Sequence, residues 1–348
     1  MNRAAAAVAV AVALAAVAAR ADDLTLGPKS LSYGVGIRVG GGYTDAPSGA
    51  SSPPSGLGLP TLDVRPYISG QIASWLKFEG NLDLGGDARI RVLDAVAKFE
   101  PTDLFNVWMG RFLPPSDRAN LSGPYYQNAW NYPTTVNGYP SIYAGRDDGA
   151  AVWGQVNKGQ FKYQAGVFTV DPAAPIAQAI YALRLVYNFL DPEPGYYNSS
   201  TYYGTKDILA LGGTLQYKKT ADPTGDKKLL GFNLDLLFEK KVTADVLTLE
   251  GAYYDFDQGN DAGKQGRSFF ALASWLFAAK AGPGRLQPMA RYQYAVPAAG
   301  GDGTKTIDAG LNYILDGHNA RAGLVVQNTT PPVGSSLTTV QLGVQIQE

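Results

Sequence analysis

The chain has 348 residues and almost balanced charge, with 29 Lys and Arg against 30 Asp and Glu. This balance excludes the basic footprint of a nucleic-acid-binding protein, so no nucleic-acid partner is expected. Cysteine is absent and the single histidine, His318, lies in a predicted surface turn, which excludes a disulfide framework, a thiolate metal site and a His-based triad.

The N-terminus has the pattern of a secretory signal peptide. Arg3 supplies a positive charge, residues 4–18 form an apolar core, and Ala19-Arg20-Ala21 is a small-x-small cleavage site. We predict cleavage after residue 21 and one domain over residues 22–348. A retained membrane anchor is the alternative, but the apolar core is shorter than the roughly 20 residues that a spanning helix needs.

The rest of the chain alternates between apolar and polar residues in segments of about ten residues, which is typical of a transmembrane antiparallel β-barrel. In residues 61–71, for example, Asp63 and Arg65 alternate with apolar neighbours. The phase of residues 89–99 is ambiguous and would fit a bulge near Leu93. Sixteen segments are predicted: 31–43, 61–71, 74–84, 89–99, 104–112, 147–156, 160–170, 180–189, 207–218, 228–240, 244–256, 267–278, 285–294, 304–315, 319–327 and 337–346.

The last segment ends beside the C-terminus, where it can pair with the first segment and close the sheet. Closure is required because an open edge in hydrocarbon leaves backbone groups unpaired. An even strand number predicts both termini on the periplasmic side, with short connections there and longer ones outside. Two connections do not fit: residues 85–88 are short, and residues 190–206 are long on the periplasmic side. A soluble β-sandwich would show the same alternation, but the signal peptide and the number of segments favour the membrane.

The longest connection, residues 113–145, has 33 residues and is rich in Tyr, Trp, Asn and Pro. A loop of this length in a compact fold is usually functional or disordered, and its aromatic composition argues against disorder. We predict that this third extracellular loop folds into the barrel and narrows the lumen.

Charged residues at the two ends of this loop are candidates for a pore constriction, since lining charges set the selectivity of a pore. The alternative is that they are solvated rim charges, which salt screens. The candidates are Arg111, Arg118, Arg146, Asp147 and Asp148.

The predicted lumen mixes both signs of charge, which favours a weakly selective pore for small hydrophilic solutes or ions over a continuous basic path. The basic pore-lining candidates are Arg65, Lys77, Lys162, Arg184, Arg291 and Arg321. The acidic residues on the same faces are Asp63, Glu79, Asp83, Asp235, Glu239, Glu250 and Asp308.

Aromatic residues of the long loop have two interpretations. They could stack a sugar or an aromatic solute, or they could pack the loop against the barrel wall, which we favour because buried aromatics dominate the packing of irregular segments. The stacking candidates are Tyr125, Tyr126 and Trp130, and the same choice applies to Tyr132, Tyr139 and Tyr143.

The run Val107-Trp108-Met109-Gly110-Arg111-Phe112-Leu113-Pro114-Pro115, before a long loop that ends in Arg146 and Gly149, resembles the phosphate-selective porin O and P family. Residues 93–95, 184–195 and 310–315 resemble other strands of that family and an extended periplasmic turn. The resemblance implies a sixteen-stranded porin of the Gram-negative outer membrane, a homotrimer surrounded by lipid and lipopolysaccharide. It also implies that Arg111 lies at the constriction.

The mixed lumen departs from the family's dense ladder of Arg and Lys, and residues 345–348 lack the usual terminal aromatic. Phosphate and other anions are therefore only one class of expected solute. An enzyme barrel would need a nucleophile and a base, which no motif marks, so we expect no enzyme activity and no cofactor. A plugged structural or adhesive barrel and a sugar-specific porin that uses the loop aromatics are the remaining alternatives.

Overall fold

The computed structural model describes residues 29–46, 55–85, 89–134, 139, 141–169, 179–220, 227–257, 266–297 and 300–348. The predicted signal peptide and its cleavage site lie outside these residues. No helix of the described part of the chain is long and apolar enough to cross a membrane.

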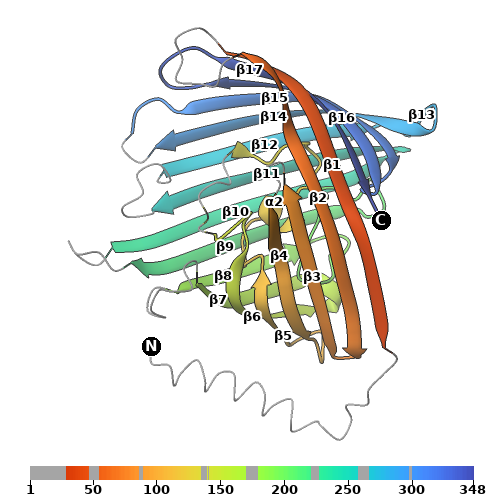
Figure 1. Ribbon diagram of the computed structural model, residues 1–348, viewed down its shortest axis with the longest axis vertical. Coiled ribbons are helices and arrows are strands. Elements are labelled where there is room, and N and C mark those ends of the chain that lie inside the picture. The colour runs from red at the N-terminus through yellow and green to blue at the C-terminus, as the bar shows by residue number, and fades with distance from the viewer. Residues whose placement is uncertain are drawn as a thin grey trace, which may run out of the picture.

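The strands form one closed antiparallel sheet, because β1 pairs with both β2 and β17 (Figure 1). The two residues of β13 only extend the β12–β14 hairpin, which leaves sixteen full strands in the described residues. The strands are β1 (Ser30–Asp45), β2 (Gly56–Ala73), β3 (Leu76–Gly85), β4 (Ile90–Phe99), β5 (Asn106–Phe112), β6 (Asp147–Val156), β7 (Phe161–Thr169), β8 (Ile180–Asn188), β9 (Ile208–Thr220), β10 (Lys227–Val242), β11 (Asp245–Asp257), β12 (Gly266–Leu276), β13 (Lys280–Ala281), β14 (Gly284–Pro297), β15 (Thr304–Asp316), β16 (Ala320–Thr330) and β17 (Leu337–Gln347).

All sixteen predicted segments are confirmed as strands, and the segment 147–156 has the predicted bounds. The bulge near Leu93 is also confirmed. Asn81 of β3 lies opposite Asp94 whereas the next residue, Leu82, lies opposite Val92, so that Leu93 is the extra residue. The bulge points both Leu93 and Asp94 inward, which explains the ambiguous phase of this segment.

The barrel is apolar outside and polar inside, the reverse of a soluble protein and as expected of a spanning barrel. Large apolar side chains are exposed on the outer face, including Leu211, Leu215, Phe232, Leu234, Leu249, Phe269, Tyr292, Leu311, Leu324 and Val344. Their strand neighbours point inward and are buried, including Arg184, Thr214, Gln216, Asn233, Asp235, Glu250, Ser274, Arg291, Asp308 and Arg321.

The first and last described strands begin and end at the same end of the barrel, which we call the turn end. Connections there are as short as residues 74–75, 243–244 and 317–319, whereas the connections at the opposite, loop end are mostly longer. As predicted from the even strand count, the first strand begins and the last strand ends on the same side of the barrel, where the connections are mostly short.

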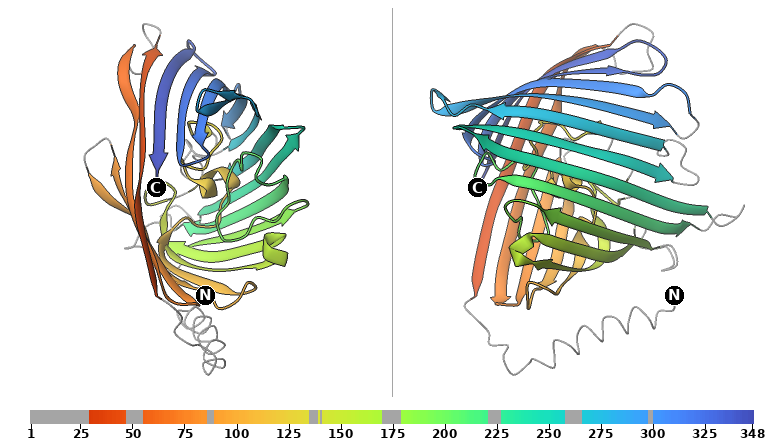
Figure 2. Two further views of the ribbon diagram at one scale, coloured as in Figure 1. Left: turned by 90° about the vertical axis from the view of Figure 1, so that its right-hand side faces the viewer. Right: turned by 180° about the vertical axis from the view of Figure 1, so that it is seen from behind.

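Two connections fold into the barrel. The third loop, residues 113–146, enters from the loop end and carries the short helix α2 (Arg118–Ser122), which lies inside the ring of strands (Figures 1 and 2). The turn-end insert, residues 189–207, enters from the other end, and its Tyr196, Ser200 and Thr201 are buried. The long connection that did not fit the length pattern is therefore a second inward-folded segment.

Candidate functional site

Local sequence fixes the third loop at α2. Asp117 caps the helix by accepting a hydrogen bond from the amide of Ala119 at 3.1 Å, and Gly123 ends it with a φ of 64°. Tyr254 of β11 donates its hydroxyl to the same carboxylate at 2.6 Å, which ties the cap to the wall. Burial raises the pKa of Asp117 to about 6, although the Tyr254 hydrogen bond opposes the shift.

The two inward-folded segments are joined by a buried ion pair. The two terminal nitrogens of Arg118 donate to the two carboxylate oxygens of Glu193 at 2.7 and 2.6 Å. Both side chains are only 1% exposed. Burial alone would raise the pKa of Glu193, but the Arg118 guanidinium outweighs burial and lowers it to about 2. The pair is therefore ionised at neutral pH.

Further hydrogen bonds hold the turn-end insert against the third loop. The Ser200 amide donates to the Tyr126 carbonyl at 3.0 Å, and the Tyr196 hydroxyl donates to the Leu113 carbonyl at 3.0 Å. His318, in the predicted turn, is half-buried between the rings of Tyr126 and Tyr203 rather than at the surface. Burial lowers the pKa of His318 to about 4, so that it is neutral at pH 7.

Arginines of the barrel wall bind carbonyl oxygens of the third loop. Arg38 donates to Trp130 at 2.6 Å, Arg291 to Asn131 at 2.9 Å, and Arg321 to Gln127 at 2.6 Å. The Trp130 ring lies against the backbone of Gly343, where a Cβ atom would be only 2.2 Å from it. These contacts fix the loop along the β14–β17 and β1 wall.

Ion pairs, hydrogen bonds and aromatic rings pack the space between the two segments and the β5–β12 wall. Arg184 forms a bidentate ion pair with Asp235 at 2.5 and 2.9 Å, and Lys162 donates to two carbonyls of the turn-end insert. Phe112, Trp108 and Tyr196 pack there in one aromatic cluster. We call this region the filled half of the lumen.

The β1–β4 wall is different, because two cavities lie between it and the inward-folded segments. The turn-end chamber has a volume of about 650 Å³ and reaches Asn319 and Glu348 at the turn end. The loop-end vestibule has a volume of about 470 Å³ and reaches Leu59 and Gly85 at the loop end. Arg65 and Pro124 line both cavities, so the cavities adjoin at this point. We call this region the open half.

Charges of alternating sign follow the wall of the open half. Arg38 pairs with Asp63 at 3.3 Å, and Arg65 lies between Asp63 at 3.8 Å and Asp83 at 3.3 Å. Further around the wall, Arg146 pairs with Asp94 at 3.3 Å. Asp63, Asp83 and Asp94 therefore each lie beside a base, and these charges form no continuous path of one sign along the wall.

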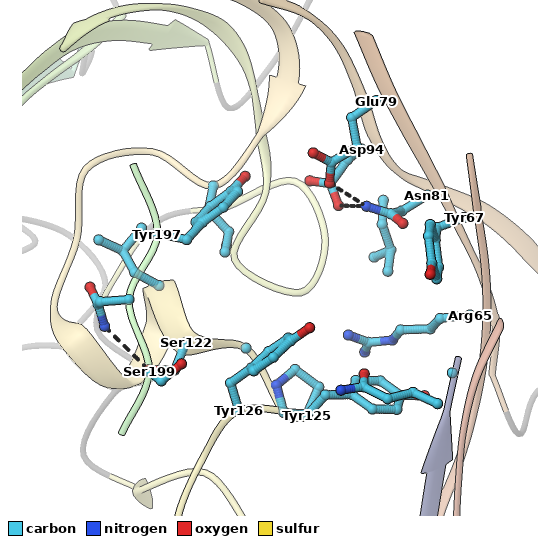
Figure 3. Close-up of a pocket in the computed structure, with 18 of the residues that line it drawn as sticks. Arg65, Tyr67, Glu79, Asn81, Asp94, Ser122, Tyr125, Tyr126, Tyr197 and Ser199 are labelled. Carbon is cyan, nitrogen blue, oxygen red and sulfur yellow. Dashed lines mark hydrogen bonds between the residues drawn. The ribbon is translucent and has the colours of Figure 1, made fainter. Parts of the chain in front are cut away.

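The third loop faces this charged wall with aromatic side chains rather than with acids. Tyr125 packs on the backbone of Gly36, where a Cβ atom would be 2.8 Å from the ring. Tyr132 and Tyr143 line the vestibule, and Tyr143 donates its hydroxyl to Asp83 at 2.6 Å. Tyr126 of the third loop and Tyr197 of the turn-end insert lie across the chamber from Asn81 and Asp94 of the wall (Figure 3).

The structure places the predicted constriction residues in different environments. Arg146 lines the chamber, Arg118 belongs to the buried ion pair, and Asp147 is buried. Arg111 needs a correction: it alternates with the inward Trp108 and Phe112 and pairs with Asp148 across the ladder, so both lie on the outer face. The resemblance placed Arg111 at the pore because a matching motif gives a position in the sequence. It does not give the face of β5 on which that side chain lies.

The predicted pore-lining bases are also divided. Arg65 lines both cavities, and Lys77 pairs with Glu100 at 2.7 Å near the turn end. The other four point inward but bind loops or buried acids: Lys162, Arg184, Arg291 and Arg321. Among the aromatics, Trp130 and Tyr139 pack the loop, whereas Tyr125 and Tyr126 line the chamber.

Sequence reasoning missed Arg38 as a loop-binding residue and Glu193 as the partner of Arg118. Arg38 had a signal, since it is the only non-glycine side chain on the inner face of β1 from Gly34 to Gly42. Glu193 had only the unexpected length of its connection as a signal.

Several solved structures share this architecture. The trimer form of OmpT from Vibrio cholerae is 10% identical, with a TM-score of 0.60 over 92% of this chain and 100% of that one. The anion-selective porin from Comamonas acidovorans is 14% identical, with a TM-score of 0.59 over 92% and 100%. OmpF of Salmonella typhi, in complex with daunomycin, is 13% identical, with a TM-score of 0.60 over 91% and 97%. The fold is that of the outer-membrane porins. No protein-family model and no curated protein sequence matches the chain.

Proposed function

We propose that the protein is a non-enzymatic porin of a Gram-negative outer membrane, with the loop end outside the cell and the turn end in the periplasm. The observation that carries the proposal is the pair of adjoining cavities along the β1–β4 wall, which together reach both ends of the barrel. The exposed apolar belt suits lipid and the acyl chains of lipopolysaccharide. The predicted signal peptide would supply the export route.

The charge pattern of the open half supports weak selectivity. Arg65 at the junction of the two cavities would attract anions, but Asp63 and Asp83 lie within 3.8 Å of its guanidinium and offset its field. A strongly anion-selective channel needs donors that are not already paired, since each must replace water around the ion. We therefore propose passage of small hydrophilic solutes, with no preference for phosphate.

We also propose a homotrimer, which the trimer form of the similar OmpT supports. We expect its subunit interface on an outward face rich in small and apolar residues rather than on charged loops. Native mass in mild detergent should correspond to three chains, and the mass of one chain would reject the trimer alone.

The direct test is single-channel recording of the purified barrel in planar bilayers. We expect stepwise insertions with an ohmic conductance in KCl and similar permeabilities for potassium and chloride. Insertion without conductance would favour a plugged structural or adhesive barrel, and tight block by phosphate would show that a basic path exists.

A further inference from the structure

The turn-end chamber combines an aromatic side and a hydrogen-bonding side. Five tyrosines line it: Tyr67, Tyr125, Tyr126, Tyr197 and Tyr202. Figure 3 shows Tyr126 and Tyr197 across an open centre from Asn81 and Asp94 of the barrel wall. Tyr126 is 44% exposed, so the chamber contains an aromatic surface that a solute can reach.

Most of the charged side chains that line this chamber already have hydrogen-bond or ion-pair partners. Asn81 donates its amide to Glu79 and to Asp94 at 2.9 Å each, and Lys98 pairs with the same Glu79. Among the described lining residues, the three bases also have partners: Arg65 binds Asp83, Arg146 binds Asp94, and Lys206 donates to the Pro192 carbonyl at 2.8 Å. An anion or a cation would have to compete with these partners.

Such a surface suits a neutral solute with many hydroxyl groups. A paired carboxylate keeps lone pairs that can accept hydrogen bonds from sugar hydroxyls. A paired guanidinium keeps N–H groups that can donate to them, and neither contact brings in a further charge. An aromatic face packs against the C–H face of a sugar ring, because a ring is apolar on its face and polar at its edge. A cavity of about 650 Å³ is within the roughly 300–1,000 Å³ range of small-molecule sites, so a disaccharide fits.

We infer that the turn-end chamber is a carbohydrate-binding subsite of the channel, with Tyr126 as the stacking surface and Glu79, Asn81 and Arg65 as the hydroxyl-binding groups. The inference rests on the proposed channel function and names its solute class. Tyr126 belongs to the loop side and Asn81 to the wall, so that a sugar bound between them would lie across the solute path and reduce the ion current.

The test is a titration of the single-channel current with maltose, with sodium phosphate at equal ionic strength as the second probe. We expect saturable block by maltose and none by phosphate. Tyr126→Ala should raise the half-blocking concentration of maltose at least about threefold, which is the effect of one lost aromatic contact. Tyr126→Phe keeps the ring and should retain the block. Tyr253→Ala, on the outer face, is the matched control and should behave as the wild type.

Open channels that maltose does not block would overturn the subsite and leave the porin proposal intact. Block by phosphate alone would assign the chamber to anions and overturn the inference. Equal block of the wild type and Tyr126→Ala would place sugar binding elsewhere and also overturn it. Absence of any conductance would instead reject the channel function on which the inference rests.

Discussion

The two halves of the lumen differ in how they use the same kinds of residue. In the filled half, the Arg118–Glu193 pair joins the two inward-folded segments and the Arg184–Asp235 pair joins two strands of the wall, and all four side chains are at most 2% exposed. In the open half, Arg65 and Asp63 are 15% and 24% exposed and line adjoining cavities. The difference teaches that inward-facing arginines of this barrel differ in their surroundings: Arg184 is buried against an acid of the wall, whereas Arg65 faces two cavities. Residue type alone does not distinguish the two environments.

Loss of the buried pair should have the largest effect. Glu193→Gln removes the bidentate partner of the buried Arg118 and leaves only Asp235, 3.9 Å from its Nε, as a counter-charge. Breaking a buried pair costs up to about 3–5 kcal/mol. We expect hydrogen exchange at α2 to accelerate strongly and the current noise to rise, because the third loop loses its ion pair with the turn-end insert. Asp255→Asn is the matched control, since its pair with Arg267 is exposed at 42% and 73%. Unchanged protection of α2 would show that the loops dock independently.

A glycine of β1 offers a second way to disturb the boundary between the halves. Gly36→Val would push Tyr125 off the wall, at a cost of about 1–3 kcal/mol for overpacking, and should change the single-channel conductance. Gly41→Val on the same strand is the control, because the nearest atom to its Cβ is 3.8 Å away. Equal conductance in the two variants would mean that Tyr125 does not border the solute path.

Charge substitutions in the lumen and on the outer face should have different effects on ion selectivity. Arg65→Ala leaves Asp63 and Asp83 without their shared base at the junction of the cavities, so the reversal potential in a salt gradient should move toward cations. We expect a change of up to about fivefold in the permeability ratio, the size of a solvent-exposed charge interaction. Arg111→Ala should leave the ratio unchanged. The opposite ranking of the two variants would contradict the strand phase described for β5.

The pH dependence of loop docking should be the smallest effect. The pKa of Glu193, about 2, is below its ordinary value, so its stabilisation is complete above about 4.5 and is lost only as pH falls through about 2. The pKa of Asp117, about 6, is above its ordinary value, so docking strengthens as pH falls from 7 toward 5. Exchange at α2, corrected for intrinsic rates, should slow at pH 5. Faster exchange at pH 5 would reject this assignment.

The sequence predicts the strands well and the interior poorly, for physical reasons. Successive side chains of a strand point to opposite faces of the sheet, so apolar and polar residues alternate along it. Strands such as residues 61–71 or 147–156 can therefore be recognised from a few side chains. The alternation predicts that Arg184 and Arg65 both face the lumen, but not that one meets Asp235 and the other a cavity. That choice depends on the two inward-folded segments, residues 113–146 and 189–207, which have no periodicity. Arg111 shows a related limit. A shift of one residue in the assumed alternation of a strand moves each side chain to the opposite face of the barrel wall.

Cysteine accessibility in the open channel tests the central claim, that solutes pass along the β1–β4 wall and not through the filled half. The native chain has no cysteine to interfere. Ser69→Cys lines the turn-end chamber, whereas Ala252→Cys points into the filled half and is 8% exposed. A small charged methanethiosulfonate reagent should sharply reduce the conductance of Ser69→Cys and leave that of Ala252→Cys unchanged. Loss of current only in Ala252→Cys would contradict the account.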